Sequence, residues 1–291
     1  MDLREKPGKV QKFLELMLRF RLITLVVMVV ASVTMLAKSW DEIAAFPIAA
    51  SERFGMWFFG IENVQGLWGS SQYLLVAGLA CIVMLFVFGG VRAGVASVVS
   101  PVLFFAALYV MGGSEDLAIP MYGILAVVSL VLFLLVKKSV ACMLFPFALA
   151  WIFLSALLVL VPCTPDSPMD LVWGVSSAFC FAVSMAYALV AGKHLAAGVP
   201  QAGALVKSAK QLFVPVLAGA LLLDAAVTVD MRGQGGAYWP LSVFWYVALV
   251  AWFFVFVFPM SSFGPWERLR SGSRRVEMKD KKKKGAGKKK K

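Results

Sequence analysis

The sequence predicts an all-α protein, a polytopic transmembrane bundle of about eight helices with both termini in the cytoplasm. Its 291 residues are 61% hydrophobic and only 15% charged, whereas soluble domains are nearer half apolar and a quarter charged. The apolar residues gather in runs of about twenty, the length that a helix needs to cross about 30 Å of hydrocarbon. The basic residues alternate between the connections as the positive-inside rule requires.

Each apolar run is expected to be a helix, because lipid leaves a spanning backbone no other partner outside a closed barrel, whose strands would alternate polar and apolar residues. With the N-terminus inside, all but three of the 28 basic residues fall on the cytoplasmic side, and the three are Lys38, Arg53 and Arg232. The expected spans are residues 22–37, 73–88, 94–111, 118–136, 139–161, 171–191, 211–229 and 241–259.

The chain divides into a basic cytoplasmic N-terminus (1–21), the eight-helix domain (22–260) and a cytoplasmic tail (261–291). The basic start and the first apolar run also fit a cleaved signal peptide, but the long leader and Lys38 favour an uncleaved anchor. The outer loop 38–72 is rich in aromatic residues. It is interpreted as an aromatic belt anchor, with a lid over a cavity as the alternative.

Two features of the predicted spans bear on how the helices pack: prolines within spans and a face of small residues. Pro146 in the fifth span, like Pro215 in the seventh, removes a backbone hydrogen bond and is expected to kink its helix. The sixth span has a face of small residues in four-residue steps, which allows close helix contact. This helix-packing face comprises Gly174, Ala178, Ala182 and Ala186.

The seventh span raises the question of Asp224, a carboxylate among apolar residues. Residues 211–223 would make about 20 Å of helix, too short to span, whereas 211–229 would make about 28 Å. Asp224 is therefore expected about 9 Å below the outer surface, facing protein or water rather than lipid. Residues on its own helix and at similar depth on others would complete a substrate or ion pocket: Thr228, Ser155 and Ser177.

Two interpretations of a buried Asp224 remain open. The carboxyl could hydrogen-bond a serine and hold helices together, or it could exchange a proton or bind a cation. The sequence does not decide between these two interpretations.

The tail is low in complexity and is expected to be disordered. Its basic residues would bind anionic lipid at the cytoplasmic leaflet; a protein partner is the alternative, and nucleic acid is disfavoured because the charge lies in this tail. The residues expected to bind are Arg274, Arg275, Lys281, Lys282, Lys283 and Lys284.

Motifs of catalysis and cofactor binding are missing from the sequence. It has one histidine, His194, too few for a histidine-rich metal site or bis-histidine haem, and we find no phosphate-binding glycine loop, GxSxG or HExxH. The four cysteines lie in or beside apolar runs without CxxC spacing and are interpreted as packing residues. No cofactor or metal is expected, and an enzyme is disfavoured, a lipid-modifying one being the third hypothesis.

One segment carries a family resemblance. The stretch KFLELMLRFRLITLVVMVVASVTMLAKSWDEI, with the following loop and second span, resembles the start of the YqhA-like bacterial membrane proteins. The resemblance covers about a quarter of the chain and implies a bacterial inner-membrane location, but no functional residues.

The sequence leaves two leading functions open. The first is a small-solute or ion permease or channel subunit that uses Asp224. The second is a non-catalytic membrane subunit, as in a secretion or conjugation apparatus, that packs through the sixth helix and recruits a partner with its tail. The second expects that helix face to be exposed. A homo-oligomer is also open.

Overall fold

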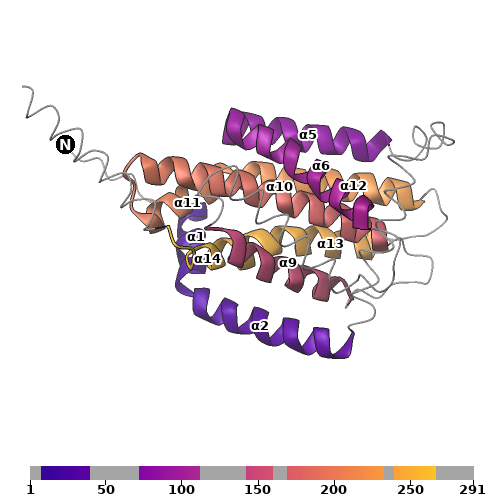
Figure 1. Ribbon diagram of the computed structural model, residues 1–291, viewed down its shortest axis with the longest axis horizontal. Coiled ribbons are helices and arrows are strands. Elements are labelled where there is room, and N and C mark those ends of the chain that lie inside the picture. The colour runs from indigo at the N-terminus through magenta and orange to yellow at the C-terminus, as the bar shows by residue number, and fades with distance from the viewer. Residues whose placement is uncertain (1–7, 40–71, 112–141, 160–168, 233–238, 267–291) are drawn as a thin grey trace, which may run out of the picture.

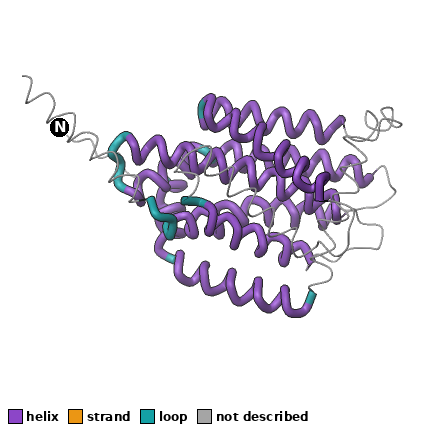
Figure 2. Tube along the Cα trace, viewed as in Figure 1, coloured by secondary structure: helices purple, strands orange, loops and turns teal. Residues whose placement is uncertain are grey.

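The computed structural model describes residues 8–39, 72–111, 142–159, 169–232 and 239–266, and these residues form helices and short turns without strands (Figure 2). The prediction of an all-α fold is therefore confirmed for this part of the chain. The helices are α1 (Lys9–Arg19), α2 (Arg21–Lys38), α5 (Gln72–Gly89), α6 (Val91–Met111), α9 (Leu144–Val159), α10 (Met169–Ala196), α11 (Gln201–Gln211), α12 (Phe213–Arg232), α13 (Trp239–Ala251), the π-helix η3 (Trp252–Val257) and α14 (Phe258–Ser261).

The longer helices lie roughly side by side along one axis, and α1 crosses one end of the bundle (Figure 1). There α1 contacts α11 and α14. Apolar residues recur along α1 at Val10, Phe13, Leu14, Met17 and Leu18, the spacing of an amphipathic helix. The expected spans include neither α1 nor α11, because basic residues interrupt both segments.

Among the described residues, three helical stretches are long and apolar enough to cross a membrane: Arg21–Lys38, Val172–Ala196 and Ser242–Ser261. The pair α11 and α12 adds a fourth if it is counted as one bent span. Helices α5, α6 and α9 are apolar but shorter by the same measure. Seven of the eight predicted spans thus contain a described helix. The remaining one, the fourth span at 118–136, lies outside the described residues. The total of eight spans remains a prediction.

The two prolines act at helix starts. Pro215 lies in the first turn of α12, where its missing N–H has no helical acceptor to lose. The chain bends by 42° between α11 and α12 just before it. Pro146 likewise lies in the first turn of α9, which begins at Leu144 rather than near residue 139. It therefore starts a helix instead of kinking one.

Helix α10 is the centre of the bundle. Residues 172–191 of this helix are all buried, and it contacts α5, α6, α9, α11 and α12. The small-residue face of this helix is buried inside the chain: Ala178 and Ala182 are almost covered and Ala186 is fully covered. A contact with another protein must therefore use a different surface from the one that the subunit hypothesis expected.

Helices α2 and α5 lie at the periphery, on opposite sides of the bundle (Figure 1). Only Thr24, Met28 and Ser32 of α2 are buried, four residues apart on one stripe. The rest of α2 presents large aliphatic side chains, of which Val30 is 59% exposed. The outer face of α5 is similar, with Val87 72% exposed. Both flanks of the bundle are therefore apolar.

Candidate functional site

The carboxylate of Asp224 lies between α12 and α13. Ser242 donates its hydroxyl proton to this carboxylate, with Oγ 2.9 Å from Oδ1 and 2.8 Å from Oδ2. Asp224 is 7% exposed, and it precedes the end of α12 by eight residues, about 12 Å of helix. Asp224 is thus buried within the structure, as predicted, and its partner is a serine on the neighbouring helix.

The other residues of the predicted pocket are distributed differently. Thr228 lies one turn beyond Asp224 on α12 and is half-buried. Ser155 on α9 and Ser177 on α10 are buried and hydrogen-bond to tryptophans. Trp173 donates to Ser155 across 3.0 Å, and Trp151 donates to Ser177 across 2.9 Å.

A third serine–tryptophan pair joins α10 to α13. The indole Nε1 of Trp245 donates to Ser176 Oγ at 2.6 Å. Trp245 follows Ser242 by three residues, so α13 is held to α12 and α10 within one turn. Further along, the indole of Trp252 donates to the backbone oxygen of Ala150 at 2.7 Å. Each of these indoles is directed into the protein interior.

Aromatic rings fill the space around these pairs. Phe147 and Phe181 meet nearly edge to face with their centroids 4.4 Å apart, and Trp151 lies 5.6 Å from Phe181. Phe104 of α6 packs against the same rings, 5.1 Å from Phe181. Such contacts add to the energy of burial and fix ring orientation. We call Phe104, Phe147, Trp151, Trp173 and Phe181 the aromatic core.

Helix ends meet at the side of the molecule where α1 lies. Gln211 donates from its amide to the backbone oxygen of Phe88 and also contacts His194, 3.3 Å away. Gln201 donates to the backbone oxygen of Ser262 at 3.1 Å. The Arg21 guanidinium carbon lies 5.5 Å from the ring centroid of Phe263. These contacts bring the cytoplasmic ends predicted for α2, α5, α10 and α12 together.

Most basic residues of the described chain lie at this end, which we call the basic end. They are Lys9, Lys12, Arg19, Arg21, Arg92, Lys193, Lys207 and Lys210. The opposite ends of α2 and α12 carry Lys38 and Arg232. A hollow of about 570 Å³ opens between α1 and α11, with Glu15, Arg19, Lys207 and Lys210 among its lining residues.

The described residues hold no cluster of three or more His, Cys, Asp or Glu side chains with metal-binding geometry. Cys81, Cys142 and Cys180 are buried, and Cys163 lies outside the described residues. The predicted tail residues 274–284 and most of the outer loop 38–72 also lie outside them.

Comparison with known proteins finds no matching family model, no matching curated protein and no matching solved structure.

Two components of the site were missed in the sequence. Ser242 was overlooked because its partner is defined by the register of α12 against α13. Only six residues of sequence separate α12 from α13, so a search for hydroxyl groups at the start of the next helix would have found it. The tryptophans of the predicted spans gave no signal on their own, because pairing them with buried serines needs the packing of α9, α10 and α13 around one another.

Proposed function

We propose that the protein is a multi-pass integral membrane protein with a structural role, a non-catalytic subunit of a larger membrane assembly. Support for the membrane location comes from the flanks of the bundle. Val30 of α2 and Val87 of α5 belong to broad aliphatic faces on opposite sides. Soluble monomers rarely expose contiguous apolar patches above a few hundred Å², whereas lipid is a suitable neighbour for such faces.

The proposed topology has eight spans with both termini in the cytoplasm. The basic end supports it, because helix ends that are distant in the sequence meet there through Gln211 and His194. Lysine and arginine are enriched on the cytoplasmic side of membrane proteins, so this end would face the cytoplasm. The alternation of charge among the residues outside the described ranges points the same way.

The structural role rests on one observation: three interior indoles and the carboxylate of Asp224 are each paired with a serine of a neighbouring helix. The hydroxyls of Ser155, Ser176 and Ser177 each accept an indole N–H. Asp224 is paired with Ser242. Polar pairs of this kind hold helices together in membranes. A permease would instead direct such groups toward a substrate path.

The partner surface that we propose is the outer face of α2. Over α2, only about a sixth of the apolar stretch is buried in the chain, so this helix retains room for another transmembrane helix. A photo-crosslinking residue at Val30, introduced into the protein in its native membrane, should give one discrete protein adduct. The same residue at the buried Met28 should give none. Lipid adducts alone at Val30 would contradict the subunit role.

A second candidate function, a proton or cation site, is favoured by one feature of Asp224. A carboxylate can accept several hydrogen bonds, and Ser242 supplies a single donor to both oxygens. The remaining capacity could hold a proton or a cation. In that case Asp224→Asn in proteoliposomes would abolish ion flux that the unchanged protein carries, while Val243→Ala, at an exposed position next to Ser242, would leave it intact. Absence of flux in the unchanged protein would exclude this candidate.

The cellular location and the tail complete the proposal. The resemblance of the N-terminal quarter to the YqhA-like proteins supports a bacterial inner membrane. The tail, with Arg274, Arg275 and Lys281 to Lys284, would lie against the anionic cytoplasmic leaflet, where each basic residue contributes about 1 kcal/mol. The tail would thereby hold the basic end at the cytoplasmic surface.

A further inference from the structure

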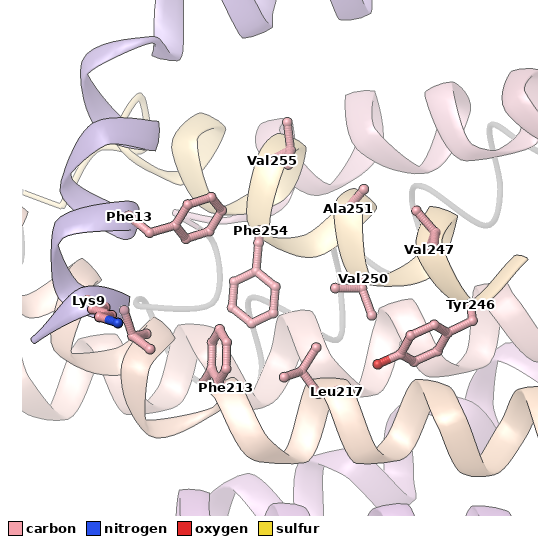
Figure 3. Close-up of a pocket in the computed structure, with 11 residues that line it drawn as sticks. Lys9, Phe13, Phe213, Leu217, Tyr246, Val247, Val250, Ala251, Phe254 and Val255 are labelled. Carbon is pink, nitrogen blue, oxygen red and sulfur yellow. The ribbon is translucent and has the colours of Figure 1, made fainter. Parts of the chain in front are cut away.

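A groove of about 500 Å³ runs along the junction of α12 with α13 and η3 (Figure 3). Helix α1 closes it at the basic end, where Lys9 and Phe13 line it. Phe13 points across the groove toward Phe254 (Figure 3). The groove is open on its outer side, since Val247 on its rim is 55% exposed.

The groove owes its shape to two breaks in helix geometry. The chain bends by 42° between α11 and α12, and Phe213, the first residue after this bend, lines the groove. Opposite, η3 is a π-helix, at whose end the Phe258 N–H donates to the Phe253 oxygen five residues back. Pro259, which has no N–H to donate, follows directly. Segments of π-helix recur at functional sites. Here the segment places Phe254 in the groove, with its ring 5.0 Å from that of Phe213.

The lining is apolar along its length and polar at its ends. Lys9 stands at the basic end, and Tyr246 stands at the other. Tyr246 follows Ser242 by one helical turn, so the groove reaches almost to the layer of Asp224. Val255 lies nine positions after Tyr246, a distance of about 13 Å along a helix. A slender apolar chain with an anionic head at the basic end would match this lining.

We propose that the groove holds one acyl chain of an anionic phospholipid from the cytoplasmic leaflet, with its phosphate at Lys9. The inference rests on the proposed membrane location and basic-end orientation. Charge complementarity selects this occupant, because Lys9 lines the groove at the basic end and forms no ion pair with a described carboxylate. A lipid without a phosphate would leave Lys9 without a counter-charge, and a zwitterionic phospholipid would bring a compensating positive charge beside it.

The test is lipid retention by the purified full-length chain, measured by mass spectrometry under non-denaturing conditions. The protein in mild detergent is mixed with equal amounts of phosphatidylglycerol and phosphatidylcholine that carry the same acyl chains. We expect one retained lipid per chain and a preference for phosphatidylglycerol of roughly fivefold, as one lysine at an anionic surface provides. Val247→Trp should fill the groove and reduce retention at least tenfold.

Matched variants make the outcome specific. Val243 is one turn from Val247 and equally exposed at 55%, but it does not line the groove. Val243→Trp should retain lipid normally. Lys9→Gln should keep a lipid but lose the preference for phosphatidylglycerol, whereas Lys12→Gln should keep both.

Three results would overturn the proposal. They are unchanged retention in Val247→Trp, an equal loss of preference in Lys9→Gln and Lys12→Gln, and a dimer that Val247→Trp dissociates, since a second copy would then occupy the groove. Alkaline carbonate washing separates this failure from that of the proposed function. A chain released by the wash would contradict the membrane location itself, and a chain that stays in the membrane without lipid in the groove would contradict this inference.

Discussion

Ser242 donates to both carboxylate oxygens of Asp224, at 2.9 and 2.8 Å, and so ties the start of α13 to the second half of α12. The two helices are antiparallel neighbours, and the same pairing continues toward the basic end in the contact of Phe213 with Phe254. The charge-bearing residue of the seventh predicted span is thus part of a helix–helix contact.

Removing the Ser242 hydroxyl should weaken this contact. Ser242→Ala leaves a buried carboxyl without its donor, and we expect the free energy of unfolding to fall by about 1 kcal/mol. Thermal unfolding in detergent, followed by circular dichroism, measures the change. Thr228→Ala, one turn from Asp224 on α12, is the control and should have little effect. Equal losses in the two variants would show that Ser242 has no specific role.

The serine–tryptophan pairs predict a contrast within α10. Ser177→Ala removes the buried hydroxyl to which the indole N–H of Trp151 donates, which should cost about 1 to 3 kcal/mol. Ser184 lies on the same helix and is fully buried, but its hydroxyl has no hydrogen-bond partner. Ser184→Ala should therefore be neutral or slightly stabilising. Unfolding of the two variants side by side tests the pairing, and a larger loss in Ser184→Ala would refute it.

The close approach of α12 to α5 and α10 depends on Gly219. A Cβ there would lie 3.0 Å from Cε2 of Phe179 and 3.2 Å from Cys81 Sγ, so Gly219→Val should overpack the core and destabilise it by about 1 to 3 kcal/mol. A Cβ added to Gly78 on α5 would have no atom within 4 Å outside its own helix backbone and chain neighbours. Gly78→Ala should stabilise its helix by up to about 1 kcal/mol. Thermal unfolding distinguishes the two, and similar changes at both positions would contradict the packing described.

The helices were largely predictable, because their signal is local. A run of uncharged apolar residues defines α2, α5 and α10 whatever they pack against. Helix α1 was missed although its signal was present, in apolar residues spaced three and four apart between Val10 and Leu18. Because of its basic residues, this segment was interpreted as a cytoplasmic N-terminus and not as a helix.

The site was predictable only in part. The burial of Asp224 follows from span length, a local quantity. Its pairing with Ser242, and the capture of Ser155 and Ser177 by indoles, depend on helix register and rotation, which a single sequence does not contain. Depth counted along each helix can place residues at one level of the bundle. It cannot tell which of them face each other.

Accessibility of a cysteine at position 224 tests the packed interior most directly. The four native cysteines are replaced by alanine, Asp224→Cys is introduced, and a membrane-impermeant thiol reagent is added from outside. We predict no labelling at 224 until the protein is unfolded in strong detergent, and rapid labelling of a cysteine in place of Arg232. Labelling at 224 in the folded protein, slowed when Ser242→Trp fills the space, would reveal a hydrated cavity and contradict a purely structural role.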